Sequence, residues 1–166
     1  MNTLLIGNAV SMIGCLIMVL IGFLKRNNHI LMAQCAQCLF MGAGNLILGG
    51  VSGFISNVVT IFRNLVFLKL KNTVFLKVFF ILLQLVLSWS SLTAGFISWL
   101  PLIAAALFTW CMDTKNAVKL KKVILCTQVM WLAYDLYFRN YVASAFDVMT
   151  MVSNLIGLYL VCRKKV

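Results

Sequence analysis

Residues 3–28 read TLLIGNAVSMIGCLIMVLIGFLKRNN, an apolar run that ends at a basic pair. The segment from residue 3 to residue 24 contains no acidic or basic side chain. A helix that crosses the hydrocarbon core of a bilayer needs about 20 such residues. Positive charge follows the run, at Lys25 and Arg26, and does not precede it. This order favours a first helix that stays in the membrane over a cleaved signal peptide.

The rest of the chain has the same character. It is 166 residues long, 63% hydrophobic and only 10% charged, with a mean hydropathy of +1.04. A soluble domain carries about a quarter charged residues, so these few charges cannot cover a surface that faces water. We expect an all-α membrane protein, a single transmembrane domain over residues 1–166. Its seven helices should cover residues 3–24, 29–48, 52–70, 73–91, 95–112, 119–138 and 142–162.

The basic residues gather in alternate connections. Arg139 alone lies on one side, and twelve lie on the other: Lys25, Arg26, Lys69, Lys71, Lys77, Lys115, Lys119, Lys121, Lys122, Arg163, Lys164 and Lys165. Cytoplasmic loops of membrane proteins are the Lys- and Arg-rich ones. The pattern predicts a multi-pass protein of the bacterial inner membrane with the N-terminus outside and the C-terminus in the cytoplasm. The net charge of +11 then indicates anionic lipid headgroups as partners and no nucleic acid.

An internal repeat is indicated at an offset of 90 residues. Asn45, Asn57, Thr60 and Asn64 correspond to Asp135, Asp147, Thr150 and Asn154. Polar residues are rare in this chain, so these matches carry more weight than the leucine matches beside them, although coincidence remains the alternative. We expect a first three-helix repeat over residues 1–72, a linker helix over 73–92 and a second repeat over 93–166. A single linker helix makes the two repeats parallel, an arrangement that transporters use with the binding site between the repeats.

Polar side chains recur at helical spacing along several predicted spans. Five stripes contain Asn57, Thr60 and Asn64; Asp147, Thr150 and Asn154; Gln34, Cys38 and Asn45; Gln128, Trp131 and Asp135; and Asn8, Ser11 and Cys15. Lipid cannot satisfy these groups, so the stripes should face the interior of a bundle. Two readings stay open. In the first, the polar side chains only form hydrogen bonds between helices. In the second, Asn64 and Asn154 form the centre of a binding site that also includes Asn57, Asp147, Thr60 and Thr150.

Arg63 is the cation expected near the middle of a span. A guanidinium stays charged at physiological pH and needs a carboxylate, several carbonyl groups or water around it. Within the spans only Asp135 and Asp147 offer carboxylates, and Asp147 is nearer in depth. We therefore expect a direct or water-bridged pair of Arg63 with Asp147, unless Asp147 binds a proton or a solute instead.

No catalytic motif stands out. The sequence has no phosphate-binding loop, nucleophile elbow or cluster with metal-ligand spacing, so we expect no enzyme, no cofactor and no metal. Cys35 and Cys38 form a CxxC pair, for which packing is favoured over a redox or metal role. Pro101 is expected to kink the fifth helix and free a carbonyl group.

Three short motifs carry a resemblance to a known family: Gly42-Ala43-Gly44-Asn45, residues 53–57 (GFISN) and Arg63-Asn64. With the layout of three, one and three helices, they resemble the YgjV-type bacterial inner membrane proteins, within the superfamily of SWEET sugar transporters and PQ-loop proteins. In sugar transporters of that superfamily, an asparagine pair on helices 3 and 7 faces the substrate, and Asn64 and Asn154 occupy the matching positions. The family's hinge motif is missing, because helix 1 has no proline and helix 5 has Pro101-Leu102.

Two functions are compatible with this pattern. The first is a facilitator or secondary transporter of a small polar solute resembling a sugar, a nucleoside or a vitamin. The second is a non-transporting membrane protein of the same fold, such as a sorting or sensing receptor.

Overall fold

The computed structural model describes residues 3–21, 27–70, 73–89, 95–112 and 117–163. Over these residues the chain forms seven α-helices and one short 3-10 helix, η2, and no strand. In chain order the elements are α1 (Thr3–Ile21), α2 (Asn27–Ile47), α3 (Val51–Lys69), α4 (Val74–Ser88), η2 (Gly95–Trp99), α5 (Leu100–Cys111), α6 (Ala117–Tyr137) and α7 (Tyr141–Arg163). The expectation of seven helices is confirmed for the described residues.

The fifth helix differs from its expected form. The segment expected as one helix over residues 95–112 divides into η2 and α5. Pro101 lies in the first turn of α5 and does not kink the middle of a helix. At this position the missing N–H of proline has no partner to lose, because the first amides of any helix lack carbonyls to bind. The predicted kink with a freed carbonyl group is therefore wrong.

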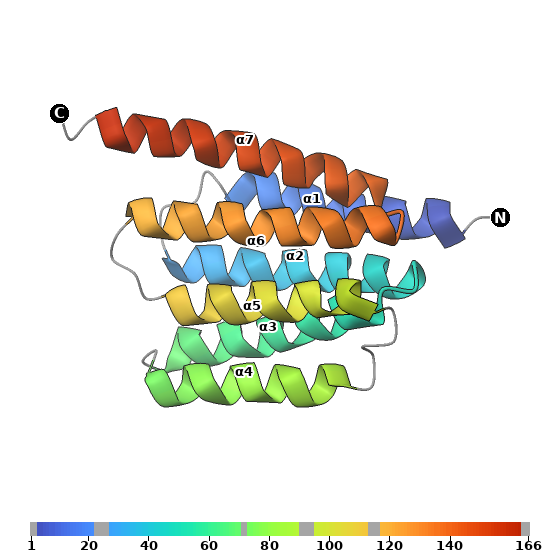
Figure 1. The fold of residues 1–166 in the computed structure, drawn as a ribbon, viewed down its shortest axis with the longest axis horizontal. Coiled ribbons are helices and arrows are strands. Elements are labelled where there is room, and N and C mark those ends of the chain that lie inside the picture. The colour runs from blue at the N-terminus through green and yellow to red at the C-terminus, as the bar shows by residue number, and fades with distance from the viewer. Residues whose placement is uncertain (1–2, 22–26, 71–72, 90–94, 113–116, 164–166) are drawn as a thin grey trace.

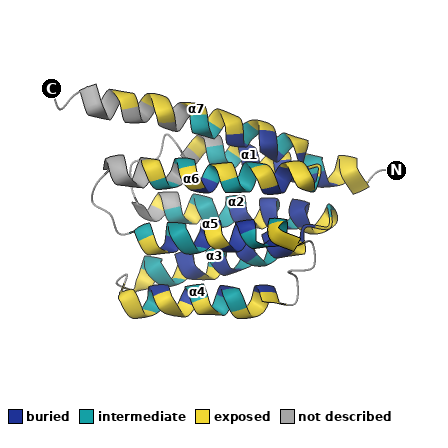
Figure 2. Cartoon of the chain, viewed as in Figure 1, coloured by how far each residue is buried: buried dark blue, intermediate teal, exposed yellow. Residues whose placement is uncertain are grey.

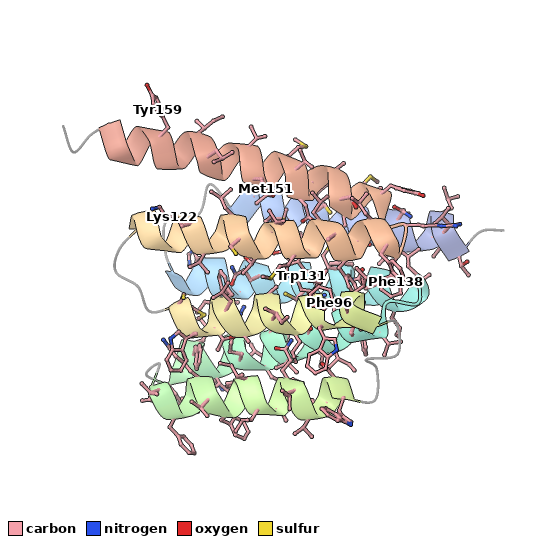
Figure 3. All side chains as sticks on the ribbon, viewed as in Figure 1. Phe96, Lys122, Trp131, Phe138, Met151 and Tyr159 are labelled. Atoms are coloured by element: carbon pink, nitrogen blue, oxygen red, sulfur yellow. The ribbon has the colours of Figure 1, made fainter. Side chains whose placement is uncertain are left out.

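The seven α-helices run alternately up and down in a bundle (Figure 1). Helix α2 packs between α1 and α3, and α6 packs between α5 and α7. The two groups of three meet where α1 contacts α7 and where α3 contacts α5, and α4 covers α3 and α5. As a result the two ends of the chain lie at opposite ends of the bundle, and Lys122 lies at the end away from Phe96 and Phe138 (Figure 3).

The bundle buries polar side chains and exposes apolar ones. Among the described residues the buried set contains 17 polar or charged side chains and only 11 hydrophobic ones. Large apolar side chains such as Leu5, Phe75, Val86 and Phe96 lie on the outside, and exposed residues follow the outer faces of the helices (Figure 2). A soluble domain shows the opposite distribution, whereas lipid favours this one. By length and composition, α3 is the one described helix that qualifies as a membrane span, with a mean hydropathy of 1.5.

Small residues bring α1 and α2 close together. A Cβ atom added at Gly44 would lie within 3.0 Å of the Gly7 carbonyl oxygen and would overlap the hydroxyl of Ser11. A Cβ at Gly14 would lie 2.8 Å from the side chain of Met41. Such contacts let helix backbones approach and are typical of helix packing in membranes. They hold the polar face of α1 against α2 at the position where the candidate site forms.

Candidate functional site

A network of buried polar side chains fills the end of the bundle where α2 and α6 finish and α3 and α7 begin. Its centre is Asn140, which is fully buried just before α7. The Asn140 side-chain amide donates hydrogen bonds to Ser11 Oγ of α1 at 3.0 Å and to Asn45 Oδ1 of α2 at 3.1 Å. Its own Oδ1 accepts a hydrogen bond from the Ala143 amide at 3.4 Å, as a helix cap does. One residue thus joins three helices.

Helix α1 also holds the turn between α6 and α7. Asn8 donates through Nδ2 to the Arg139 carbonyl at 3.1 Å and accepts through Oδ1 from the Val142 amide at 3.0 Å. Arg139 has a φ of 59°, a left-handed conformation that L-residues adopt at a cost. The two hydrogen bonds with Asn8 stabilise the backbone at that strained residue and at the start of α7.

The turn between α2 and α3 has the same backbone geometry. Four of its hydrogen bonds have counterparts 90 residues later, with lengths that agree within 0.1 Å. Each runs from the backbone amide of one residue to the backbone carbonyl of another. In the first turn they are Leu48 to Gly44, Gly49 to Leu46, Gly50 to Asn45 and Phe54 to Gly50. In the second turn they are Phe138 to Tyr134, Arg139 to Leu136, Asn140 to Asp135 and Ser144 to Asn140. Gly49, with a φ of 87°, takes the place of Arg139. Both turns are Schellman caps, in which one left-handed residue ends the helix.

Tyr134 of α6 crosses to the start of α3. Its hydroxyl oxygen accepts a hydrogen bond from the Gly53 amide at 2.7 Å and one from Ser52 Oγ at 3.2 Å. The ring is fully buried, and a Cβ at Gly53 would lie 2.6 Å from it. The absence of a side chain at Gly53 is therefore what lets the tyrosine reach the α3 backbone. Trp131 packs edge-to-face on Tyr134, with ring centroids 5.9 Å apart.

Two carboxyl groups complete this network. Asp135 is 1% exposed and Asp147 is 4% exposed, and their carboxyl groups lie within hydrogen-bonding reach of each other. Gln128 Nε2 donates to Asp147 Oδ1 at 2.5 Å. The sequence stripe of Gln128, Trp131 and Asp135 therefore does face the interior, and it meets the stripe of Asp147 there.

Arg63 lies in a separate cluster and does not form the expected pair with Asp147. Its Nη1 donates to Thr109 Oγ1 of α5 at 2.7 Å, and its Nε and Nη2 donate to Asn64 Oδ1 at 3.2 and 3.0 Å. The guanidinium also lies 5.5 Å from the centre of the Phe108 ring. Among the described residues no ion pair joins this arginine to either aspartate. Neutral oxygens and a ring face take the role that was expected of a carboxylate.

The remaining predicted residues are distributed along α3 and α7. Asn64 is fully buried and donates to Gln34 Oε1 at 3.2 Å, and Asn57 donates to the Gly53 carbonyl in its own helix at 2.9 Å. Thr60 and Thr150 are half-buried, and Thr150 lies 3.9 Å from the Met18 sulfur atom. The side chain of Asn154 lies outside the described residues.

Asn140, Tyr134 and Thr109 were not predicted from the sequence. For Asn140 a signal existed, because Arg139-Asn140 corresponds to the turn glycines Gly49-Gly50 at the repeat offset. The partners of Tyr134 and Thr109 lie 81 and 46 residues away in the sequence, and no periodicity marks them. Only the way the helices cross brings these pairs together.

Comparison with known proteins assigns the chain to a family. The profile of Imp-YgjV, described as bacterial inner membrane protein, matches residues 5–165. The chain belongs to the Imp-YgjV family. No curated protein and no solved structure matches it. Membership agrees with the apolar exterior of the bundle and makes this chain a bacterial inner membrane protein, in which a buried acid pair and a buried arginine are costly and therefore functional candidates.

Proposed function

We propose that this Imp-YgjV protein is a facilitator or secondary transporter that moves a small polar solute across the bacterial inner membrane. The solute class is sugar-, nucleoside- or vitamin-like. The proposal includes seven spans, an outside N-terminus and two parallel three-helix units joined by α4, as in SWEET-like proteins. The observation that carries it is the polar interior, to which both groups of three helices contribute. A bundle that only needed to be stable in lipid would not require so many buried polar groups.

The packing of the helices supports the repeat. The 90-residue offset places α1 on α5, α2 on α6 and α3 on α7. The same offset converts the α1–α7 contact into the α5–α3 contact, and both contacts are present. It also relates the two Schellman turns, hydrogen bond by hydrogen bond. A two-fold axis along the bundle is the simplest relation between the units, and transporters built this way bind solute between the repeats.

The proposed site lies along the faces of α3 and α7. Asn64 and Asn154 are its centre, with Asn57, Thr60, Asp147 and Thr150 along the same stripes. A hydroxylated solute would replace Gln34 as the partner of the Asn64 amide. Arg63 then has a positioning role, because its two hydrogen bonds to Asn64 Oδ1 fix the orientation in which that amide points away from α3.

A second candidate is a non-transporting membrane protein, such as a sorting or sensing receptor. The observation that favours it is that Asn64, Arg63 and Tyr134 already bind partners on other helices. In that case the buried polar groups act as interhelical hydrogen bonds, and no solute passes.

The test is uptake by the purified protein in liposomes, with pooled labelled sugars, nucleosides and vitamins. We expect uptake above that of empty liposomes for at least one pool, and loss of it in Asn64→Ala. Gln84→Ala is the matched control, because it removes a buried contact of similar size, the 2.7 Å hydrogen bond from Gln84 to Ser56 between α4 and α3. No uptake of any pool by folded protein would favour the non-transporting candidate.

A further inference from the structure

The acid pair at the α6–α7 turn is the least satisfied group of side chains in the described part of the protein. Both oxygens of Asp135 and Oδ2 of Asp147 are buried and receive no hydrogen bond of good geometry from the described residues. Gln128 supplies the single amide donor to Asp147 Oδ1. The Asn140 amide lies beside Asp135 but makes its hydrogen bonds to Ser11 and Asn45. Buried polar atoms normally have partners, so three buried oxygens without a donor need a chemical explanation.

No cation neutralises the pair in the described residues. Arg63 binds Thr109 and Asn64, and Arg139 is exposed in the turn. From α1 the titratable side chain that faces the pair is Cys15, and from α6 it is Tyr134. The described parts of α5 and η2 contain no Asp, Glu, Lys, Arg or His, and α2 and α3 offer neutral groups near this end, such as Asn45 and Ser52.

Two carboxylates in contact cannot both keep their charge without a cation between them. One proton removes the repulsion and supplies the missing hydrogen bond from one carboxyl group to the other. We propose that Asp135 and Asp147 form a proton-binding site that holds one exchangeable proton between the two carboxyl groups. The inference does not depend on solute transport, because the site would bind its proton in a transporter and in a receptor alike.

Proton loss at this site would affect the bundle directly. The two aspartates stand on consecutive helices, and the turn between those helices carries Asn140, which holds α1 and α2. Two unprotonated carboxylates would push α6 and α7 apart and so loosen the contacts of Asn140. The site therefore links the protonation state to the packing of the two groups of three helices.

The test is infrared spectroscopy of the purified full chain in lipid nanodiscs, in H₂O and in D₂O. The chain has only three acidic residues, Asp113, Asp135 and Asp147, so the carboxyl signal is simple to assign. We expect a protonated-carboxyl band that persists at neutral pH, shifts in D₂O and is lost at alkaline pH. The band should disappear in Asp135→Asn/Asp147→Asn and remain in Asp113→Asn, the matched control. Each single variant should shift it, because the surviving carboxyl loses its partner.

A second measurement covers variants that fail to fold. Dicyclohexylcarbodiimide modifies protonated carboxyl groups in apolar surroundings, and mass spectrometry of the unaltered protein should place the adduct on Asp135 or Asp147, at one per chain. The proposal is overturned if the band is absent at neutral pH and the reagent leaves both aspartates unmodified. It is also overturned if sodium chloride, but not choline chloride, removes the band at constant pH, because the site would then bind a metal cation.

Discussion

The Arg63 guanidinium donates a hydrogen bond of 2.7 Å to the hydroxyl of Thr109, which joins α3 to α5. The same hydroxyl donates to the Ala105 carbonyl at 2.6 Å, so the threonine is held in the orientation that accepts from arginine. This contact lies on one of the two seams between the groups of three helices. It replaces the expected contact of Arg63 with Asp147.

A double-mutant cycle should reflect this partner. We expect Thr109→Ala to lower the free energy of unfolding by about 1–3 kcal/mol, because it strands a donor of the buried guanidinium. Combined with Arg63→Gln, its effect should be non-additive by about 0.5 kcal/mol or more. The effects of Arg63→Gln and Asp147→Asn on the free energy of unfolding should instead be additive within about 0.5 kcal/mol, because the two residues share no partner. Thermal unfolding in detergent measures all of these, and coupling only in the second cycle would contradict the structure.

Loss of the Tyr134 hydroxyl should destabilise the protein. Tyr134→Phe leaves the ring in place but strands the buried Gly53 amide, at a cost of about 1–3 kcal/mol. Tyr137→Phe is the control, since that ring is 56% exposed on the same helix and should change stability by less than about 0.5 kcal/mol. Equal midpoints of unfolding for the two variants would show that the Tyr134 contact carries no stability.

Substitutions at the two left-handed turn residues, Gly49 and Arg139, should change the stability of the protein in opposite directions. Gly49→Ala places a Cβ atom at a φ of 87° and should destabilise by about 1 kcal/mol, whereas Arg139→Gly removes a Cβ atom at a φ of 59° and should stabilise by a similar amount. Arg139→Lys is the control for charge and should have little effect. If Arg139→Gly lowers the midpoint of unfolding, the side chain of Arg139 contributes more than its backbone costs.

The orientation in the membrane is tested by fusions. A cytoplasmic reporter placed after residue 166 should be active, and one inserted between residues 90 and 95 should be inactive, because Lys and Arg cluster in the alternate connections of the sequence. Cysteine labelling from each side of the membrane measures the same orientation independently. Labelling of both chain ends from one side would rule out seven spans.

Much of the fold followed from simple sequence properties. Apolar runs of span length place six of the seven helices within about three residues of their observed ends, and the fifth run divides into η2 and α5. Asp135 and Asp147 were recognisable as site candidates because acids are so rare in this chain. The contact between Asp135 and Asp147 could not be predicted from the sequence, because it depends on how the α6–α7 turn folds back. Arg63 was expected to pair with Asp147, and only the crossing of α3 and α5 selects Thr109 over an aspartate.

The contacts of α1 also set an order of assembly. Asn8 and Ser11 are synthesised before their partners Arg139, Asn140 and Val142, which lie 129 or more residues later in the chain. During biogenesis the first helices must therefore wait in the bilayer with polar groups that have not met their final acceptors and donors. Arrival of the α6–α7 hairpin supplies these partners, and a chain cut between α4 and η2 would need both fragments in the same membrane to form the contacts. Helix α1 therefore acts as a binding surface for the α6–α7 turn of the same chain.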